Sequence, residues 1–526
     1  MLGTEWTLGS DSIQWLLIGT LGVSFVGLFG IASIGSTTID RLADNQARRI
    51  LANSATPLAA QLLNRFVDLV FAAIALRILG VEGNGQYAIA TVTWLYLKTI
   101  SDFGLSILVA REVAKNPDSA GRLIGSTTLF RLSMLALLLP LLISFLVLGG
   151  HWLDLSRASA LAILLLTISI VPASYGEAIN SVFTGVERLH LPAVLTVFTN
   201  LIRFSVGLLL LGHGLGVPGI ASAAVFAALC NAVALHLAVQ RQNVRIAWGL
   251  SATEAKELAQ TAWPLLLNGL LITVFFRIDT FVIQGFAGTR ALGIYDAAYK
   301  LPNLLPLLPS YFVLAIFPLL SRQSGSDLRR TFELGAKFLV VIAWLIVLVT
   351  LFAAPLFIRI LGGKAFLPDA ADTLRILIWF TPLHYLNGIA QYAVIAANRQ
   401  REIAPAYAVA TAFNVAANLI GVPLFGYRAA AVVTVLTELV LFLFLRGSLE
   451  RGLGAIDWKS LLLRPFLAFT VAYLGSLVVP HLLWLSIPCA IVLYTIALRL
   501  TGTIRSEELA LLRPLLPRFS SSRLQP

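Results

Sequence analysis

The sequence predicts an all-helical integral membrane protein, with fourteen transmembrane helices in two six-helix lobes plus two C-terminal helices, and one extra N-terminal helix. Of its 526 residues, 58% are hydrophobic and 12% are charged, and the mean hydropathy is +0.86, far above that of soluble domains. Apolar windows of about 20 residues, the length that spans a bilayer core, follow one another almost without gaps from residue 13 to residue 500. The loops between them are too short to form a soluble domain.

The first window, 13–34, follows Glu5 and Asp11 and has no basic residue before it, unlike a secretory signal. It is expected to be an extra helix that starts outside, although an over-extended gene start is the alternative interpretation. The other fourteen windows are 55–79, 86–110, 122–149, 158–182, 193–213, 217–239, 263–286, 291–320, 332–354, 371–397, 402–420, 428–446, 463–482 and 484–500.

The basic residues are distributed unevenly between the two sets of loops. Loops on the same side as residues 41–50 and the C-terminus hold 25 of the 38 cations, whereas the opposite loops hold six. The positive-inside rule therefore places the C-terminus in the cytoplasm and the protein in the cytoplasmic membrane. This topology also accounts for the net charge of +12, so no nucleic-acid partner is expected.

The cysteines and histidines give no sign of metal or redox chemistry. Cys230 and Cys489 lie in apolar windows, and the six histidines are scattered singly, so neither a disulfide framework nor a metal site is expected. The motif G-x-x-x-x-G-K-[ST] does not occur, so ATP hydrolysis by this chain is not expected either. We expect no cofactor, and transport coupled to a proton or sodium gradient or to the membrane potential.

Two loops carry the same motif. "GVEGNGQY" at 80–87 and "GTRALGIY" at 288–295 both read G-x4-G-x-Y at an offset of 208, and each precedes a helix with a lysine, Lys98 or Lys300. With six windows between the two copies, the motif predicts two halves of the same orientation. The predicted domains are 1–46 (extra helix and linker), 47–245 (N-lobe), 246–450 (C-lobe) and 451–526 (last two helices and basic tail).

Three stretches carry a resemblance to a known family. They are the segment that begins with "RRILANSATPLAAQLLNRFVDLVFAAIALRIL", the basic tail "AREVAKNPDSAG", and the start of the second half, "AQTAWPLLLNGLLITVFFRIDTFVIQGFAGTRALGIYDAAYKL". All three resemble the Wzx-type polysaccharide-biosynthesis flippases of the multidrug, oligosaccharidyl-lipid and polysaccharide exporter superfamily. The resemblance covers roughly residues 47–500, and the extra first helix and the long basic tail depart from it.

The resemblance implies a fold, a substrate and partners. The fold would have twelve to fourteen helices in two lobes around a central cavity that opens alternately to either side. The substrate would be a polyprenyl-pyrophosphate-linked oligosaccharide, with membrane lipids around the protein. Polysaccharide polymerase and glycosyltransferases of the same pathway would be further partners.

Twelve charged residues lie deep in the apolar windows. Each costs roughly 2.5 to 3.5 kcal/mol at the centre of an inserted helix, so these side chains must face each other, water or a charged ligand. They are Arg65, Lys98, Arg131, Arg203, Arg277, Lys300, Asp68, Asp102, Glu177, Asp279, Asp296 and Glu438.

Polar residues recur at helical spacing in several windows, the pattern expected where an apolar helix borders a wet cavity. By contrast, Arg277 and Asp279 are about 200° apart, so one of them is expected to pack within its own lobe. The polar sets are Gln61, Asn64, Arg65 and Asp68; Trp94, Lys98, Ser101 and Asp102; Glu177, Asn180, Ser181 and Thr184; Thr196, Thr199, Asn200 and Arg203; His384, Asn387, Gln391 and Asn398; and Asn414 and Asn418.

We predict that the deep cations form a cationic interior for a pyrophosphate, because guanidinium and ammonium groups make charge-assisted bonds to phosphate oxygens. Tyrosine, tryptophan, asparagine and histidine side chains would contact the hydroxyl groups and ring faces of the sugars. The alternative is that these residues only hold the helices together. The predicted substrate-binding residues are Arg65, Lys98, Arg131, Arg203, Arg277, Lys300, Tyr295, Tyr299, Asn303, His384, Asn387 and Gln391, and the predicted ion-coupling residues are Asp68, Asp296 and Glu177.

The stretch "GIYDAAYKLPNLLPLLP" combines part of this site with a bend. Tyr295, Asp296, Tyr299, Lys300 and Asn303 occupy one arc of the helix of about 140°. The four-residue spacing lets Asp296 and Lys300 neutralise each other. Three prolines follow, which free backbone carbonyls and allow the helix to bend.

Three other functions stay open. A drug or cation antiporter of the same superfamily would need an acidic, aromatic-lined pocket, whereas the deep cations favour an anionic substrate. A lipid II flippase has the same charge requirement. A membrane polymerase or ligase would need a large external loop with catalytic residues, and the longest external loop here, about 355–370, is short.

Overall fold

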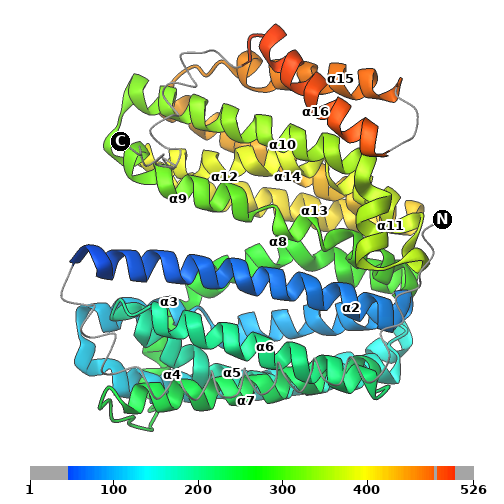
Figure 1. The fold of residues 1–526 in the computed structure, drawn as a ribbon. Coiled ribbons are helices and arrows are strands. Elements are labelled where there is room, and N and C mark those ends of the chain that lie inside the picture. Colours follow the sequence, from blue (N-terminus) through cyan, green and yellow to red (C-terminus); the bar gives the residue numbers. More distant parts are fainter. Residues whose placement is uncertain (1–45, 479–482, 504–526) are drawn as a thin grey trace, which may run out of the picture. The chain divides into compact units, whose positions relative to one another are not determined.

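The computed structural model describes residues 46–478 and 483–503, which form helices joined by short connections (Figure 1). Ten of the described helices are long and apolar enough to cross a membrane. The predicted all-helical membrane fold is confirmed, and the count of fourteen transmembrane helices stays a prediction. The first apolar window, 13–34, and the basic tail after residue 503 lie outside the described residues.

Within the described residues, each later window predicted from the sequence overlaps at least one helix. In the first part of the chain the helices are α2 (Gln46–Asp102), α3 (Leu105–Lys115), α4 (Ala120–Trp152), α5 (Arg157–Gly185), α6 (His190–Gly212), α7 (Gly216–Gln240) and α8 (Ala252–Tyr299). They are followed by α9 (Leu307–Arg322), α10 (Gly325–Leu361), α11 (Asp369–Leu377), α12 (Phe380–Ala396), α13 (Ile403–Phe425), α14 (Tyr427–Leu453), α15 (Arg464–Leu477) and α16 (Leu483–Leu500).

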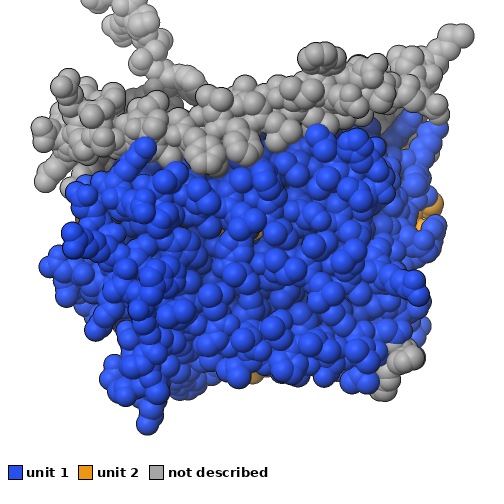
Figure 2. All heavy atoms as spheres, turned by 90° about the horizontal axis from the view of Figure 1, so that it is seen from below, with its two compact units in different colours: residues 1–300, 359–367, 417–430 blue, residues 301–358, 368–416, 431–526 orange. Residues whose placement is uncertain are grey.

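The chain forms two compact units. Unit 1 comprises residues 1–300, 359–367 and 417–430, and unit 2 comprises residues 301–358, 368–416 and 431–526. Figure 2 shows one face of unit 1 as a continuous surface of packed side chains. The predicted domain boundaries at 46, 245 and 450 stay a prediction.

Three predicted windows are interrupted in the structure. Window 86–110 breaks between α2 and α3, where Phe103 and Gly104 adopt positive φ angles of 55° and 77°. Window 291–320 breaks after Tyr299 at a short 3-10 turn, Pro302–Leu304, in the proline-rich stretch that the sequence predicts to bend. Window 371–397 breaks before α12 because Pro382 has no N–H to donate to a carbonyl one turn earlier.

The repeated G-x4-G-x-Y motifs adopt the same backbone conformation. Gly80 interrupts α2 at φ 67° and ψ −169°, and Gly288 interrupts α8 at φ 82° and ψ 173°. Both conformations belong to a region that only glycine enters readily. Each glycine therefore marks the kink that separates two successive helices, one for each predicted transmembrane window, within α2 and within α8.

The second glycines of the motifs form a reciprocal contact between α2 and α8. A Cβ atom on Gly85 would lie 2.0 Å from the carbonyl oxygen of Thr289, and a Cβ atom on Gly293 would lie 1.9 Å from that of Val81. Asn84 Nδ2 also donates to the Gly293 carbonyl over 2.8 Å. Small residues let helix backbones approach this closely in membranes, so the motif encodes a helix crossing.

The connection between α7 and α8 is built into unit 1 in the same way. The backbone of residues 244–248 runs along α4, where a Cβ atom on Gly121 or Gly125 would lie 2.0 Å from the carbonyl oxygen of Arg245 or Ala247. Ala247 N–H donates to the Gly121 carbonyl over 3.1 Å. This connection is therefore a packed part of unit 1 and not a loose tether.

We expect Gly85→Ala and Gly293→Ala each to destabilise the protein by about 1 to 3 kcal/mol, because the added methyl group overlaps a backbone oxygen in a packed crossing. Thermal unfolding of the detergent-solubilised protein measures the effect. Gly212→Ala is the matched control, because a Cβ atom there meets nothing within 4 Å. Equal unfolding temperatures for all three variants and the wild type would contradict this account of the motif.

Candidate functional site

A cavity of about 450 Å³ lies within unit 1, between helices α2, α5, α6 and α7. This volume is in the range of sites for small organic ligands. Its wall combines the small or apolar side chains of membrane helices with a set of polar residues from all four helices. The polar residues are Asn64, Asp68, Tyr87, Thr91, Trp94, Ser169, Glu177, Asn180, Thr196, Thr199, Asn200, Arg203 and Asn231.

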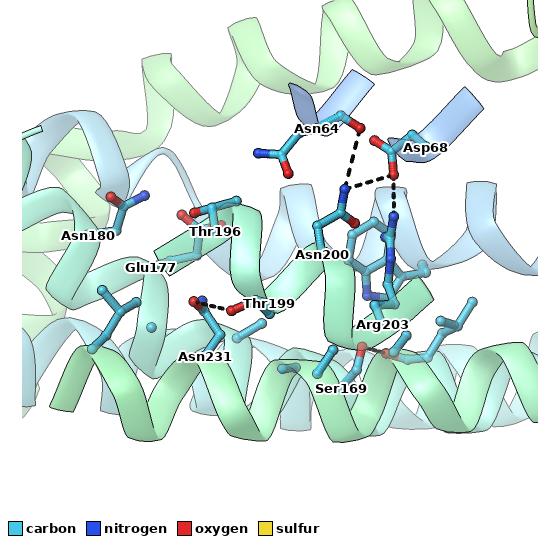
Figure 3. Close-up of a pocket in the computed structure, with 18 of the residues that line it drawn as sticks. Asn64, Asp68, Ser169, Glu177, Asn180, Thr196, Thr199, Asn200, Arg203 and Asn231 are labelled. Atoms are coloured by element: carbon cyan, nitrogen blue, oxygen red, sulfur yellow. Dashed lines mark hydrogen bonds and ion pairs between the residues drawn. The ribbon is translucent and has the colours of Figure 1, made fainter. Parts of the chain in front are cut away.

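An ion pair joins α2 and α6 at one end of this cavity (Figure 3). Arg203 Nη2 donates to Asp68 Oδ1 over 2.5 Å, and both side chains are roughly two-fifths exposed. Asn200 Nδ2 donates to the same carboxylate oxygen over 3.3 Å and to the Asn64 carbonyl over 3.4 Å. These contacts fix Asp68 and Arg203 as a neutral pair in the cavity wall.

A second ion pair joins α2 and α5. Lys98 Nζ lies 2.8 Å from Glu177 Oε1 and 5.5 Å from the centre of the Trp94 ring. Glu177 lines the main cavity and also a void of about 10 Å³, whose other charged residues are Lys98, Asp102 and Arg131. The predicted ion-coupling residues Asp68 and Glu177 are thus both held by cations from the same unit.

The remaining polar wall of the cavity is uncharged. Thr199 Oγ1 donates to Asn231 Oδ1 over 3.2 Å, which connects α6 to α7. Asn64 Oδ1 and Trp94 Nε1 are buried and have no hydrogen-bond partner among the described residues. A buried polar atom left without a partner is costly, so a rotation of either side chain toward the cavity, where it could find a polar partner, would be favoured.

Arg131 is enclosed by protein groups. Its side chain is 1% exposed, Nε donates to Asp102 Oδ1 over 3.0 Å, and Nη2 donates to Ser106 Oγ over 3.2 Å. Nη1 donates to Thr127 Oγ1 over 3.3 Å. Because Asp102 ends α2 and Ser106 lies in α3, Arg131 connects the two helices across the break between them.

The other predicted residues of unit 1 lie outside the cavity lining. Arg65 is exposed on α2. The Arg277 guanidinium lies 5.4 Å from the centre of the Tyr299 ring. Lys300 Nζ lies 2.6 Å from Asp296 Oδ2, as the four-residue spacing of Asp296 and Lys300 predicts. The Tyr295 hydroxyl donates a hydrogen bond to Asp279 over 2.5 Å, and Asp279 is buried within unit 1. Asp279 is therefore the residue of the Arg277 and Asp279 pair that packs inside, as expected for one of two side chains about 200° apart on a helix.

In unit 2, the predicted polar residues surround a buried carboxylate. Glu438 is 2% exposed and bonds to His384 Nδ1 over 2.8 Å and to Asn387 Nδ2 over 2.8 Å. Gln391 donates to the Tyr407 hydroxyl over 2.8 Å. Asn303 lies half-buried in the 3-10 turn after α8. In the part of the chain that the structure describes, no group of three or more His, Cys, Asp or Glu residues could hold a metal ion.

The cavity includes residues that were not among the predicted site residues. Asn64, Asn180, Thr196, Thr199 and Asn200 lie on the predicted polar faces, so helical spacing identified their orientation without assigning them a role. Asn231 interrupts the apolar run "AALCNAVAL" of α7, and a single asparagine gives no periodic signal. An isolated polar residue in an apolar helix is the feature by which it could have been found.

The amino-acid sequence matches models of known protein families. The sequence model of the polysaccharide biosynthesis protein family matches residues 50–324, more than half of the chain. The chain belongs to the polysaccharide biosynthesis protein family. A second model, MatE, matches residues 264–438 of this polysaccharide biosynthesis protein. The resemblance stated from the sequence motifs is confirmed, whereas no curated protein sequence matches the chain.

Solved structures with the same fold are flippases and transporters. The lipid II flippase MurJ in an inward closed conformation is 12% identical with a TM-score of 0.67, over 88% of this chain and all of MurJ. An inward-facing multidrug resistance MATE transporter of the MOP superfamily is 14% identical with a TM-score of 0.56, over 73% and 95%. The eukaryotic MATE transporter AtDTX14 is 13% identical with a TM-score of 0.53, over 77% and 99%. The polysaccharide biosynthesis protein therefore has the fold of MOP-superfamily transporters.

We expect Arg131→Met to destabilise unit 1 by about 3 to 5 kcal/mol, because it leaves the Asp102 carboxylate without its cation in a buried network. Thermal unfolding in detergent measures the loss, and the double variant Asp102→Asn/Arg131→Met should recover part of it. Arg122→Met is the control, since Arg122 is exposed and lies 3.8 Å from Glu254. An Arg131→Met variant as stable as this control would contradict the enclosed role of Arg131.

Proposed function

We propose that the protein is a flippase that moves a polyprenyl-pyrophosphate-linked oligosaccharide across the cytoplasmic membrane by alternating access, for the export of a surface polysaccharide. Membership of the polysaccharide biosynthesis protein family supports the substrate class. The observation that carries the proposal is the polar cavity of unit 1, because a protein that only anchors a complex has no need of such a cavity in a membrane segment.

The wall of the cavity favours a glycan over a hydrophobic cation. A site for drug cations needs carboxylates that are available to the ligand and aromatic faces around it. Here Asp68 is occupied by Arg203 over 2.5 Å, and Glu177 by Lys98 over 2.8 Å. Four asparagine side chains and several hydroxyl groups remain, and these are hydrogen-bonding partners for sugars.

Transport of the lipid-linked glycan is tested with the full-length protein in proteoliposomes. We expect a fluorescent lipid-pyrophosphate-linked oligosaccharide to cross the bilayer faster than in protein-free vesicles, as measured by protection of the label from an external quencher. The same lipid without sugar, lipid II and a cationic dye are the comparison substrates. Transport of the dye without transport of the oligosaccharide lipid would contradict the proposed function.

Glu177→Gln should reduce this transport about tenfold or more, because it leaves Lys98, just behind the cavity wall, without its carboxylate partner in a membrane segment. Initial transport rates, normalised to the folded protein recovered from gel filtration, measure the effect. Glu112→Gln is the matched control, since Glu112 pairs with Lys115 over 3.1 Å on α3 outside the cavity. An equal loss of transport rate in the two variants would contradict a specific role of the Lys98 and Glu177 ion pair in transport.

We also propose that an ion gradient drives the transport cycle, with the paired carboxylates Asp68, Glu177 and Asp296 as candidate coupling groups. A change of protonation or cation occupancy at such a pair alters the charge that the membrane must accommodate. Transport rates are measured while the pH, sodium and voltage gradients are collapsed one at a time. Rates that stay the same in all three cases would exclude this coupling.

A further inference from the structure

We propose that the cavity of unit 1 binds the uncharged sugar part of the substrate and leaves the pyrophosphate outside, so that the protein selects for neutral glycans. This inference rests on the proposed function and assigns one part of the substrate to one cavity. It differs from the cationic interior predicted from the sequence, in which the deep arginines and lysines bind phosphate.

The charges of the cavity cancel. Its described lining contains one cation, Arg203, and two carboxylates, Asp68 and Glu177. Arg203 bonds to Asp68 over 2.5 Å, and Lys98 behind the wall bonds to Glu177 over 2.8 Å. A pyrophosphate entering this cavity would meet two carboxylates and would have to separate an ion pair in order to reach a cation, whereas an uncharged glycan requires neither.

The uncharged groups of the wall match the hydrogen-bonding chemistry of sugar hydroxyls. A sugar hydroxyl both donates and accepts, and so does an asparagine side chain. Asn64, Asn180, Asn200 and Asn231 bring such side chains from all four helices of the cavity. Figure 3 shows these side chains spread along the cavity rather than gathered at one point, as an extended chain of sugars requires.

Two unsatisfied atoms and one indole ring add to this match. Asn64 Oδ1 accepts no hydrogen bond from the described residues and Trp94 Nε1 donates none, although both are buried and belong to residues of the wall. Both atoms are shielded from solvent in this conformation, so a ligand hydroxyl reaches them only when these side chains turn toward the cavity. The faces of aromatic rings such as those of Trp94 and Tyr87 pack against the C–H surfaces of sugars through apolar contact.

The pairing of Asp68 with Arg203 then acts as a specificity filter. A glycan with a uronate group gains little from this neutral pair, because its carboxylate would have to displace Asp68 from Arg203 before it could bond to the guanidinium. Removal of the Asp68 charge frees the Arg203 guanidinium, which can then pair with the acidic sugar. The same cavity would thereby change from selecting neutral glycans to accepting acidic ones.

The test uses the full-length protein in nanodiscs, titrated by calorimetry with three probes that carry no lipid. These are a neutral oligosaccharide, an oligosaccharide of the same length with one uronate, and inorganic pyrophosphate. We expect the wild type to bind the neutral probe best. The double variant Asp68→Asn/Arg203→Gln removes both charges of the filter and should therefore bind the neutral and the uronate probes with affinities within about threefold of each other.

Two further variants probe the wall. Asn180→Ala should weaken binding of the neutral probe about tenfold, the loss expected when a sugar hydroxyl loses its partner. Asp68→Asn alone should strengthen binding of the uronate probe about tenfold. The double variant Arg446→Gln/Glu450→Gln is the matched control, because it removes an ion pair of 2.9 Å on α14 that does not line the cavity.

Tightest binding of pyrophosphate by the wild type, with loss of all binding in the double variant of Asp68 and Arg203, would overturn the proposal. So would unchanged affinity for all three probes in Asn180→Ala and Asp68→Asn, when gel filtration shows that both variants are folded. Vesicle transport of the lipid-linked substrate is measured separately. Transport without glycan selectivity rejects this inference alone, whereas absence of transport in the wild type rejects the proposed function.

Discussion

The cost of a charge in the hydrocarbon layer is the constraint on which the rest of unit 1 depends. Three of the ion pairs that offset this cost involve α2: Asp68 with Arg203, Glu177 with Lys98, and Asp102 with Arg131. Each pair joins α2 to a different helix, α6, α5 or α4. Because a buried pair is held only when its partners are well placed, these bonds also fix α2 against its neighbours. The polar wall of the cavity is a product of the same pairing.

A cavity built in this way differs from a simple basic pocket. Opposite charges that satisfy each other contribute structure and little net field, so recognition passes to the uncharged groups between them. Asparagines 64, 180, 200 and 231 provide those groups at the cavity of unit 1. In unit 2, by contrast, Glu438 is closed off by His384 and Asn387 at 2% exposure. The same residue types therefore serve an open wall in one place and a sealed core in another.

Much of this fold could be predicted from the sequence, because bilayer thickness sets the helix length and hydropathy locates the helices. The pairing of Asp296 with Lys300 followed from their spacing along one helix. The pairing of Lys98 with Glu177, 79 residues apart, could not be predicted, since helical angles give the face of a residue and not the helix that it meets. The helix breaks at Gly104 and before Pro382 were also missed, because the hydropathy of a window reports its composition and not the backbone angles of its residues. Asn231 was missed because a lone polar residue has no period.

The reciprocal contact of Gly85 and Gly293 has a consequence for the origin of the chain. Each glycine lies against the carbonyl four residues before its counterpart, Thr289 or Val81, in the other motif. Such an exchange is what a two-fold axis through the crossing would produce between identical subunits. A single half-length ancestor carrying one G-x4-G-x-Y motif could have made this contact twice in a homodimer. Duplication and fusion would then have preserved the dimer interface as an internal seam, while the sequences around it diverged.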